Sequence, residues 1–162
     1  MRFVWGRKAS GGRLHGVEGA YRMNRDVSRG LNARHGHGGC MVCGDYSPGF
    51  PNLSFALRED GSVHADFLAG AHLQGYTGLL HGGVIATLLD SAMTHCLFHR
   101  GVTAVTADLR VRYVQPIACG SRLEIDAHII KACRSLYQLR GEIACNGTLG
   151  AWAEAKFLPK RS

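Results

Sequence analysis

The sequence lacks any uninterrupted apolar run of about 18 residues, the length that marks a membrane-spanning helix. Its first residues, MRFVWGRKASGGRLHG, contain no continuous hydrophobic segment of the kind found in secretory signal peptides. The six cysteines are too sparse for a small secreted disulfide scaffold, and Cys96 lies inside an apolar stretch. These absences favour a cytoplasmic protein with reduced thiols and no membrane partner.

Acidic residues are also few, 12 against 19 lysines and arginines, which gives a formal net charge of +7. Most of the excess lies in residues 1–34, which hold eight basic and two acidic residues. The rest of the chain is nearly neutral, so the charge does not predict a nucleic-acid partner. We interpret residues 1–34 as a flexible basic arm, 35–49 as a loop rich in glycine and cysteine, and 50–159 as one folded domain.

The hydrophobic pattern of this domain predicts two strands, one helix and four further strands. The first two strands flank an Asp60-Gly61 hairpin turn. Between residues 82 and 99, apolar residues recur at helical spacing. Alternating segments follow near 105–113, 123–129, 135–145 and 148–158. In the first of them the alternation puts Val105, Ala107, Leu109, Val111 and Tyr113 on one face.

One long helix among antiparallel strands predicts an α+β fold. Because an antiparallel sheet must bury one face and the chain supplies a single helix, the sheet is expected to curl around it. The edge strand and the flank of the helix then remain exposed, and a second copy of the chain would cover them.

The helix carries one acid, Asp90, nine residues after His81 in the stretch LLHGGVIATLLDSAMTHC. Nine residues are two and a half helical turns, so Asp90 points away from His81 and lies about 13 Å further along the axis. The His-Gly-Gly turn and the acid therefore cannot meet within one chain. Two antiparallel helices in a dimer could bring them together.

The His-Gly-Gly turn and Asp90 offer the two kinds of group that acyl transfer needs. The first amides of a helix have no helical acceptor, and Gly82 and Gly83 would let a substrate carbonyl approach them as in an oxyanion hole. A carboxylate facing that carbonyl can act as a nucleophile or as a general base, and Thr94, one turn later, could hold the water. The alternative is that Thr87, Asp90, Ser91, Thr94 and His95 form only a solvated polar face.

Three blocks of the sequence resemble the hotdog-fold acyl-CoA thioesterases, in the branch related to phenylacetic-acid-pathway enzymes. They are CMVCGDYSPG, GYTGLLHGGVIATLLDSAM and VTADLRVRYVQPI, and the similarity spans residues 40–158. The resemblance implies a sheet wrapped around one helix of about residues 82–99. It also implies a homodimer with sites at the interface, and in many members a homotetramer.

The resemblance also implies residue roles. The Gly82 amide would polarise the thioester carbonyl, His81 would order the turn, and Asp90 would be the catalytic carboxylate with Thr94 as its helper. Thr106 matches a small hydroxyl residue near the water. Gln74 lies next to the position where the family often has an amide side chain, and it is carried over with Gly83 as a substrate-binding residue.

The stretch HGHGGCMVCGD offers His35, His37, Cys40 and Cys43 as a possible tetrahedral zinc set. A single CxxC in a glycine-rich loop is weak support, so the sequence-based prediction is no metal site, with the cysteines packed near the pocket.

The predicted function is hydrolysis of an acyl-CoA thioester to the free acid and CoA, without a cofactor. The alternatives are an acyl-CoA-binding sensor that uses the same pocket without catalysis, and an enoyl-CoA hydratase of the same fold.

Overall fold

The structure, a computed structural model, describes residues 30–32, 34–44, 50 and 53–160. The described elements confirm the predicted order of two strands, one long helix and four strands. In chain order they are β1 (Ala56–Leu57), β2 (Val63–Leu68), the short 3-10 helix η1 (Ala71–Leu73), α2 (Gly82–Phe98), β3 (Ala104–Tyr113), β4 (Arg122–Cys133), β5 (Leu136–Cys145) and β6 (Thr148–Pro159).

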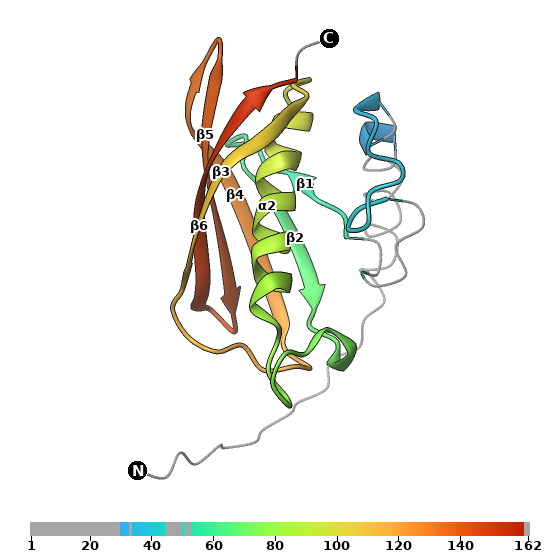
Figure 1. Cartoon of the computed structure of the whole chain (residues 1–162), viewed down its shortest axis with the longest axis vertical. Helices are drawn as coiled ribbons and strands as arrows, with labels where there is room; N and C mark the ends of the chain where they lie inside the picture. The colour runs from blue at the N-terminus through green and yellow to red at the C-terminus, as the bar shows by residue number, and fades with distance from the viewer. Residues whose placement is uncertain (1–29, 33, 45–49, 51–52, 161–162) are drawn as a thin grey trace.

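The six strands form one antiparallel sheet in the order β1-β2-β4-β5-β6-β3. The sheet curves around α2, which lies along its concave face (Figure 1). The predicted α+β architecture, an antiparallel sheet wrapped around one central helix, is therefore confirmed. In the described chain the ten-residue strand β3 pairs only with β6, so its other edge carries unpaired backbone groups.

The core lies between α2 and the inner face of the sheet. Leu88, Leu89 and Met93 of the helix have no exposed surface, and neither do the strand residues Ile125, Leu139, Ile143 and Phe157. Gly141 in β5 allows the helix to approach closely, because a Cβ there would lie 3.2 Å from the Leu89 side chain. This packing holds α2 in a fixed position relative to every strand that borders the site.

A β-bulge between Thr106 and Asp108 changes the predicted faces of β3. Leu109 and Val111 pack against the core as expected, but Val105 is 53% exposed. The prediction that Val105 and Ala107 share the face of Leu109 is therefore wrong, since the extra residue of a bulge reverses the alternation. The same reversal turns Thr106 towards α2.

The first strand of the hairpin, β1, is only two residues long and therefore shorter than the alternation of apolar residues before Asp60 predicts. The Asp60-Gly61 turn is present, with Gly61 at a φ of +79°, and Leu57 is paired with Val63. Leu53 and Phe55 are buried but precede β1, and Leu57 is 51% exposed.

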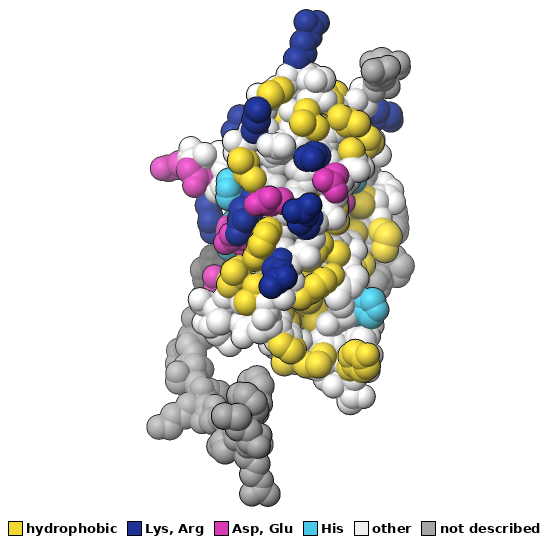
Figure 2. All heavy atoms as spheres, turned by 60° about the vertical axis from the view of Figure 1, so that its left-hand side comes forward, with side chains coloured by type: hydrophobic (Ala, Val, Ile, Leu, Met, Phe, Trp, Pro, Cys, Tyr) yellow, Lys and Arg dark blue, Asp and Glu magenta, His cyan; other side chains and the backbone are white. Residues whose placement is uncertain are grey.

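The convex face of the sheet carries both charged and apolar side chains. Figure 2 shows charged side chains of both signs between apolar ones on the side where β5 and β6 lie. Arg140 bonds Glu142 at 2.8 Å and stacks 4.4 Å from the Trp152 ring, and Lys156 lies 3.7 Å from Asp108. These charged side chains are thus paired with one another.

The N-terminal segment, residues 34–44, lies beside the C-terminal half of α2, since His35 and His37 contact Phe98 and residues 37 and 40–43 share a pocket with the helix. Residues 30–32 and 34 are helical, and Leu31 and Asn32 are buried, so the described chain is folded from Gly30 onward. Residues 1–29 of the predicted arm and 45–49 of the predicted loop lie outside the described residues. Among the described helices, none has the length and apolar character needed to cross a membrane.

Candidate active site

The turn that begins α2 is held by the side chain of His81. His81 is the N-cap residue, and its Nδ1 accepts a hydrogen bond from the Gly83 amide at 2.8 Å. A Cβ on Gly83 would lie 2.9 Å from that nitrogen, so only glycine fits without displacing the ring. The His81 side chain thus caps the turn through the Gly83 amide.

The Gly82 amide is the remaining donor of this turn. Within the described part of the chain its N–H has no acceptor, whereas its carbonyl accepts from the Tyr113 hydroxyl at 2.9 Å. The amide also lies at the positive end of a 17-residue helix. Tyr113, which sequence reasoning left without a role, fixes this first residue of the helix. Its position on the β3 face that packs against α2 is the signal that could have identified it.

Gln74 precedes the turn and stabilises the loop that leads to it. Its Oε1 accepts from the Gly78 amide at 3.1 Å, and its backbone forms an isolated bridge with Leu80. The His81 amide in turn donates to the Leu73 carbonyl at 3.0 Å. These bonds give the loop 74–81 a defined shape next to the first residues of α2.

Asp90 lies in the middle of α2 and faces β3. Its Oδ1 accepts from the Thr106 hydroxyl at 2.7 Å, the contact that the bulge in β3 makes possible. Burial raises the pKa of the Asp90 carboxyl above its usual range, and the Thr106 bond and nearby His37 offset part of this increase. An acid shifted in this direction is better matched to proton transfer near neutral pH.

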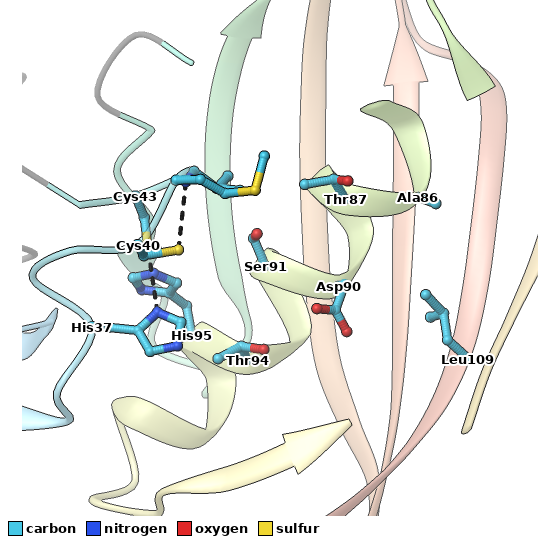
Figure 3. A pocket seen from close by; sticks show the side chains of 12 residues that line it. His37, Cys40, Cys43, Ala86, Thr87, Asp90, Ser91, Thr94, His95 and Leu109 are labelled. Carbon is cyan, nitrogen blue, oxygen red and sulfur yellow. Dashed lines mark hydrogen bonds between the residues drawn. The ribbon is translucent and has the colours of Figure 1, made fainter. Parts of the chain in front are cut away.

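Asp90 borders a pocket of ≈ 350 Å³. In Figure 3 its carboxylate lies between Thr94, one helical turn on, and Leu109 of β3. The opposite wall comes from residues 37 and 40–43 of the N-terminal segment. The pocket thus combines one acid, the hydroxyls of Thr87, Ser91 and Thr94, and apolar side chains, as expected for a site that binds an apolar group next to a reacting centre.

The C-terminal part of the polar face of α2 is buried, whereas Thr87 and Asp90 of that face are partly exposed. Ser91 and Thr94 are less than 10% exposed, and His95 has no exposed surface, because the N-terminal segment covers them. The burial of His95 contradicts the alternative in which it belongs to a solvated polar face, although it does lie in the last turn of the helix. Helical periodicity gives the face of a residue, but it does not reveal that a distant segment covers that face.

The predicted site residues form two groups in the single chain. Asp90 and Thr94 line the pocket, and Thr106 donates to Asp90. His81, Gly82, Gly83 and Gln74 lie at or just before the beginning of the helix. Eight residues of helix separate Gly82 from Asp90, which is about 12 Å at 1.5 Å per residue. No single small substrate group can contact both within one chain.

The domain resembles known proteins in sequence and in structure. Residues 77–151 match the family model of the thioesterase superfamily. The acyl-coenzyme A thioesterase THEM4 of Rattus norvegicus is 34% identical over 83 residues, which cover 51% of this chain and 36% of that protein. The chain thus spans well under half the length of this relative.

Two solved structures share the fold. A thioesterase protein from Streptococcus pneumoniae with coenzyme A has a TM-score of 0.64 at 21% identity, over 70% of this chain and 94% of that one. A phenylacetic acid degradation-related protein from Ralstonia eutropha has a TM-score of 0.60 at 22% identity, over 65% and 83%. The domain that carries His81, Gly82 and Asp90 therefore has the hotdog fold of these thioesterase structures, and its residues 77–151 resemble the thioesterase superfamily in sequence.

Proposed function

We propose that this protein hydrolyses an acyl-CoA thioester to the free acid and CoA, at a site formed by two copies of the chain. The observation that carries the proposal is the separation of two complementary groups on one helix. The Gly82 amide at one end is a donor without an acceptor in the described chain, and the Asp90 carboxylate lies about 12 Å away in a pocket. Acyl transfer to water needs both.

A dimer can bring the two groups together. The unpaired edge of β3 lies beside α2, and Thr106 and Tyr113 of this strand contact Asp90 and Gly82. Antiparallel pairing of two β3 edges would place two α2 helices side by side in opposite directions. The Gly82 amide of one protomer would then lie near Asp90 of its partner, giving two equivalent sites. Further association into a homotetramer is compatible with this dimer.

The proposed reaction uses Asp90 as the base. Its carboxylate takes a proton from a water held by Thr94, and the resulting hydroxide attacks the thioester carbonyl carbon. The carbonyl oxygen becomes an oxyanion that accepts a hydrogen bond from the Gly82 amide of the partner. The intermediate collapses, the carbon–sulfur bond breaks, and the CoA thiolate takes the proton from Asp90.

A second route has Asp90 attack the carbonyl itself and form a mixed anhydride that water then hydrolyses. The two routes differ in one measurable species. Hydroxylamine added during turnover would intercept an anhydride on Asp90 and form an aspartyl hydroxamate, detectable by peptide mass spectrometry, and the base route would leave Asp90 unmodified.

The substrate class rests on the relatives. The rat relative is named as an acyl-coenzyme A thioesterase, and the Streptococcus pneumoniae neighbour contains coenzyme A. The mostly apolar pocket beside Asp90 is compatible with an acyl chain. These points support acyl-CoA as the substrate of this chain as well.

The test is release of free thiol from a panel of short, long and aromatic acyl-CoAs. Wild-type protein should release CoA from at least one of them, and Asp90→Asn should reduce turnover about 100- to 10,000-fold, the usual contribution of general-base catalysis. Asp66→Asn, on exposed β2, is the matched control and should retain activity. Binding without thiol release would support the sensor, and hydration of an enoyl-CoA would support the hydratase.

A further inference from the structure

Three metal-binding side chains converge in the segment that covers the polar face of α2. His37, Cys40 and Cys43 each place a ligand atom within 4.8 Å of the other two. The Cys43 sulfur lies 3.7 Å from Nδ1 of His37. Cys43 is buried, and His37 and Cys40 are half-buried.

The backbone of this segment is wound so that both sulfurs point the same way. The Gly44 amide donates to the Cys40 carbonyl at 2.9 Å, and the Val42 amide donates to the Cys40 sulfur at 3.5 Å. A Cβ on Gly44 would overlap the backbone of Cys40, so the tight turn requires glycine there. An amide directed at a cysteine sulfur stabilises the thiolate form that binds metal ions.

His95 of α2 provides an independent observation on the opposite wall. It has no exposed surface, and neither of its ring nitrogens has a hydrogen-bond partner among the described residues. Burying an imidazole without a partner costs free energy, so a buried histidine normally contacts an acceptor, a donor or a metal ion. His95 borders the same pocket as His37, Cys40 and Cys43, and Figure 3 shows the four side chains grouped at one end of it.

We propose that His37, Cys40, Cys43 and His95 bind one zinc ion in tetrahedral coordination. Two thiolates and two imidazoles are a common zinc ligand set, and soft sulfur ligands favour zinc over magnesium or calcium. Binding releases the two thiol protons to solvent as two zinc–sulfur bonds form. His35 is not included among the ligands because it has other contacts. Its Nδ1 lies 2.7 Å from the Thr103 hydroxyl, and its ring stacks on Phe98 at a centroid distance of 4.5 Å.

The ion would connect the N-terminal segment to the helix that carries Asp90. His37 and His95 both contact the Phe98 ring, at centroid distances of 4.9 and 5.3 Å, so the two walls are already adjacent. His95 lies outside the 4.8 Å group, and its coordination would draw residues 37–43 closer to α2. The zinc would thereby fix the wall of the pocket that faces Asp90 and Thr94. This inference does not depend on the proposed hydrolase activity.

The first test is the metal content of the full chain, purified without a metal-affinity tag and measured by elemental mass spectrometry. We expect close to one zinc per chain. Replacement by cobalt should give thiolate-to-cobalt charge-transfer absorption and the strong visible bands of tetrahedral cobalt. X-ray absorption at the zinc edge should show two sulfurs at about 2.3 Å and two imidazole nitrogens at about 2.0–2.1 Å.

Variants identify the ligands. Cys40→Ser, Cys43→Ser and His95→Asn should each lose most of the bound metal, while Cys145→Ser and His128→Asn, which alter residues outside the group, should retain it. Folded wild-type protein without metal after zinc supplementation would refute the proposal, as would ligand variants that keep full metal content. A Cys40–Cys43 disulfide in the wild-type chain, or a zinc-edge spectrum with a single imidazole, would also overturn it, and these two results do not depend on how well the variants fold.

Discussion

Replacing Gly82 with proline would remove one proposed catalytic group and leave the rest of the helix unchanged. Gly82 is the first residue of α2, the position at which proline is well tolerated, because the amide there has no helical acceptor. The preceding residue, His81, has a ψ of 133°, which is the extended conformation that a following proline prefers. A Cβ on Gly82 would lie 3.5 Å from the Tyr113 ring, an ordinary van der Waals distance.

The expected loss follows from the role of the amide. Removing one oxyanion-hole donor typically lowers kcat about 100- to 1000-fold, which corresponds to about 2.7–4 kcal/mol of transition-state stabilisation. Because the donor strengthens its bond only when charge develops on the oxygen, KM should change little. The assay is steady-state thiol release on the best acyl-CoA, with circular dichroism and thermal unfolding to verify the fold.

Gly82→Ala is the matched control. It adds the same Cβ contact with Tyr113 but keeps the N–H, so its kcat should remain within a few-fold of wild type. If the proline variant folded like wild type and hydrolysed the thioester at the alanine variant's rate, the Gly82 amide would have no part in the chemistry.

Three further predictions concern Asp90, Thr106 and the core. Burial raises the pKa of Asp90, so its ionised form destabilises the fold above that pKa. Asp90→Asn should therefore raise the Tm at neutral pH, and this increase in Tm should shrink as the pH falls towards 4, where Asp90 becomes protonated. The Thr106 bond lowers the pKa of Asp90, so Thr106→Val should move the acidic limb of the kcat/KM profile to higher pH. If the limb did not move, it would not report the ionisation of Asp90. Leu88 has no exposed surface, so Leu88→Ala should lower the free energy of unfolding by about 2–5 kcal/mol in chemical denaturation, and a loss below 1 kcal/mol would contradict the packing described.

The sequence predicted the order of the elements and the bounds of the helix well, because these segments have a strong period. The apolar spacing between 82 and 99 gave α2 to within one residue, and the alternation of Leu123, Ile125 and Ala127 gave the buried face of β4. The type of an element depends on local patterns, which a single sequence contains, whereas the lengths of β1 and β4 differ from those that the alternation predicts.

The environment of the site depends on contacts between distant residues, and there the sequence was less informative. Simple alternation put Thr106 on the face away from the helix, and only the bulge after it produces the 2.7 Å bond to Asp90. His95 reads as one more polar residue on α2, and its burial depends on a segment more than 50 residues earlier that covers it. Such long-range contacts leave no periodic signal.

The central claim is that one protomer supplies the Gly82 amide and its partner supplies Asp90. Heterodimers that pair a Gly82→Pro chain with an Asp90→Asn chain, isolated with two different tags, test it directly by thiol release. A shared site leaves one of two sites intact, so the mixed dimer should recover about half of wild-type turnover although each homodimer is nearly inactive. If each site lay within a single chain, every site would carry a defect, and a mixed dimer as inactive as its parents would contradict the account.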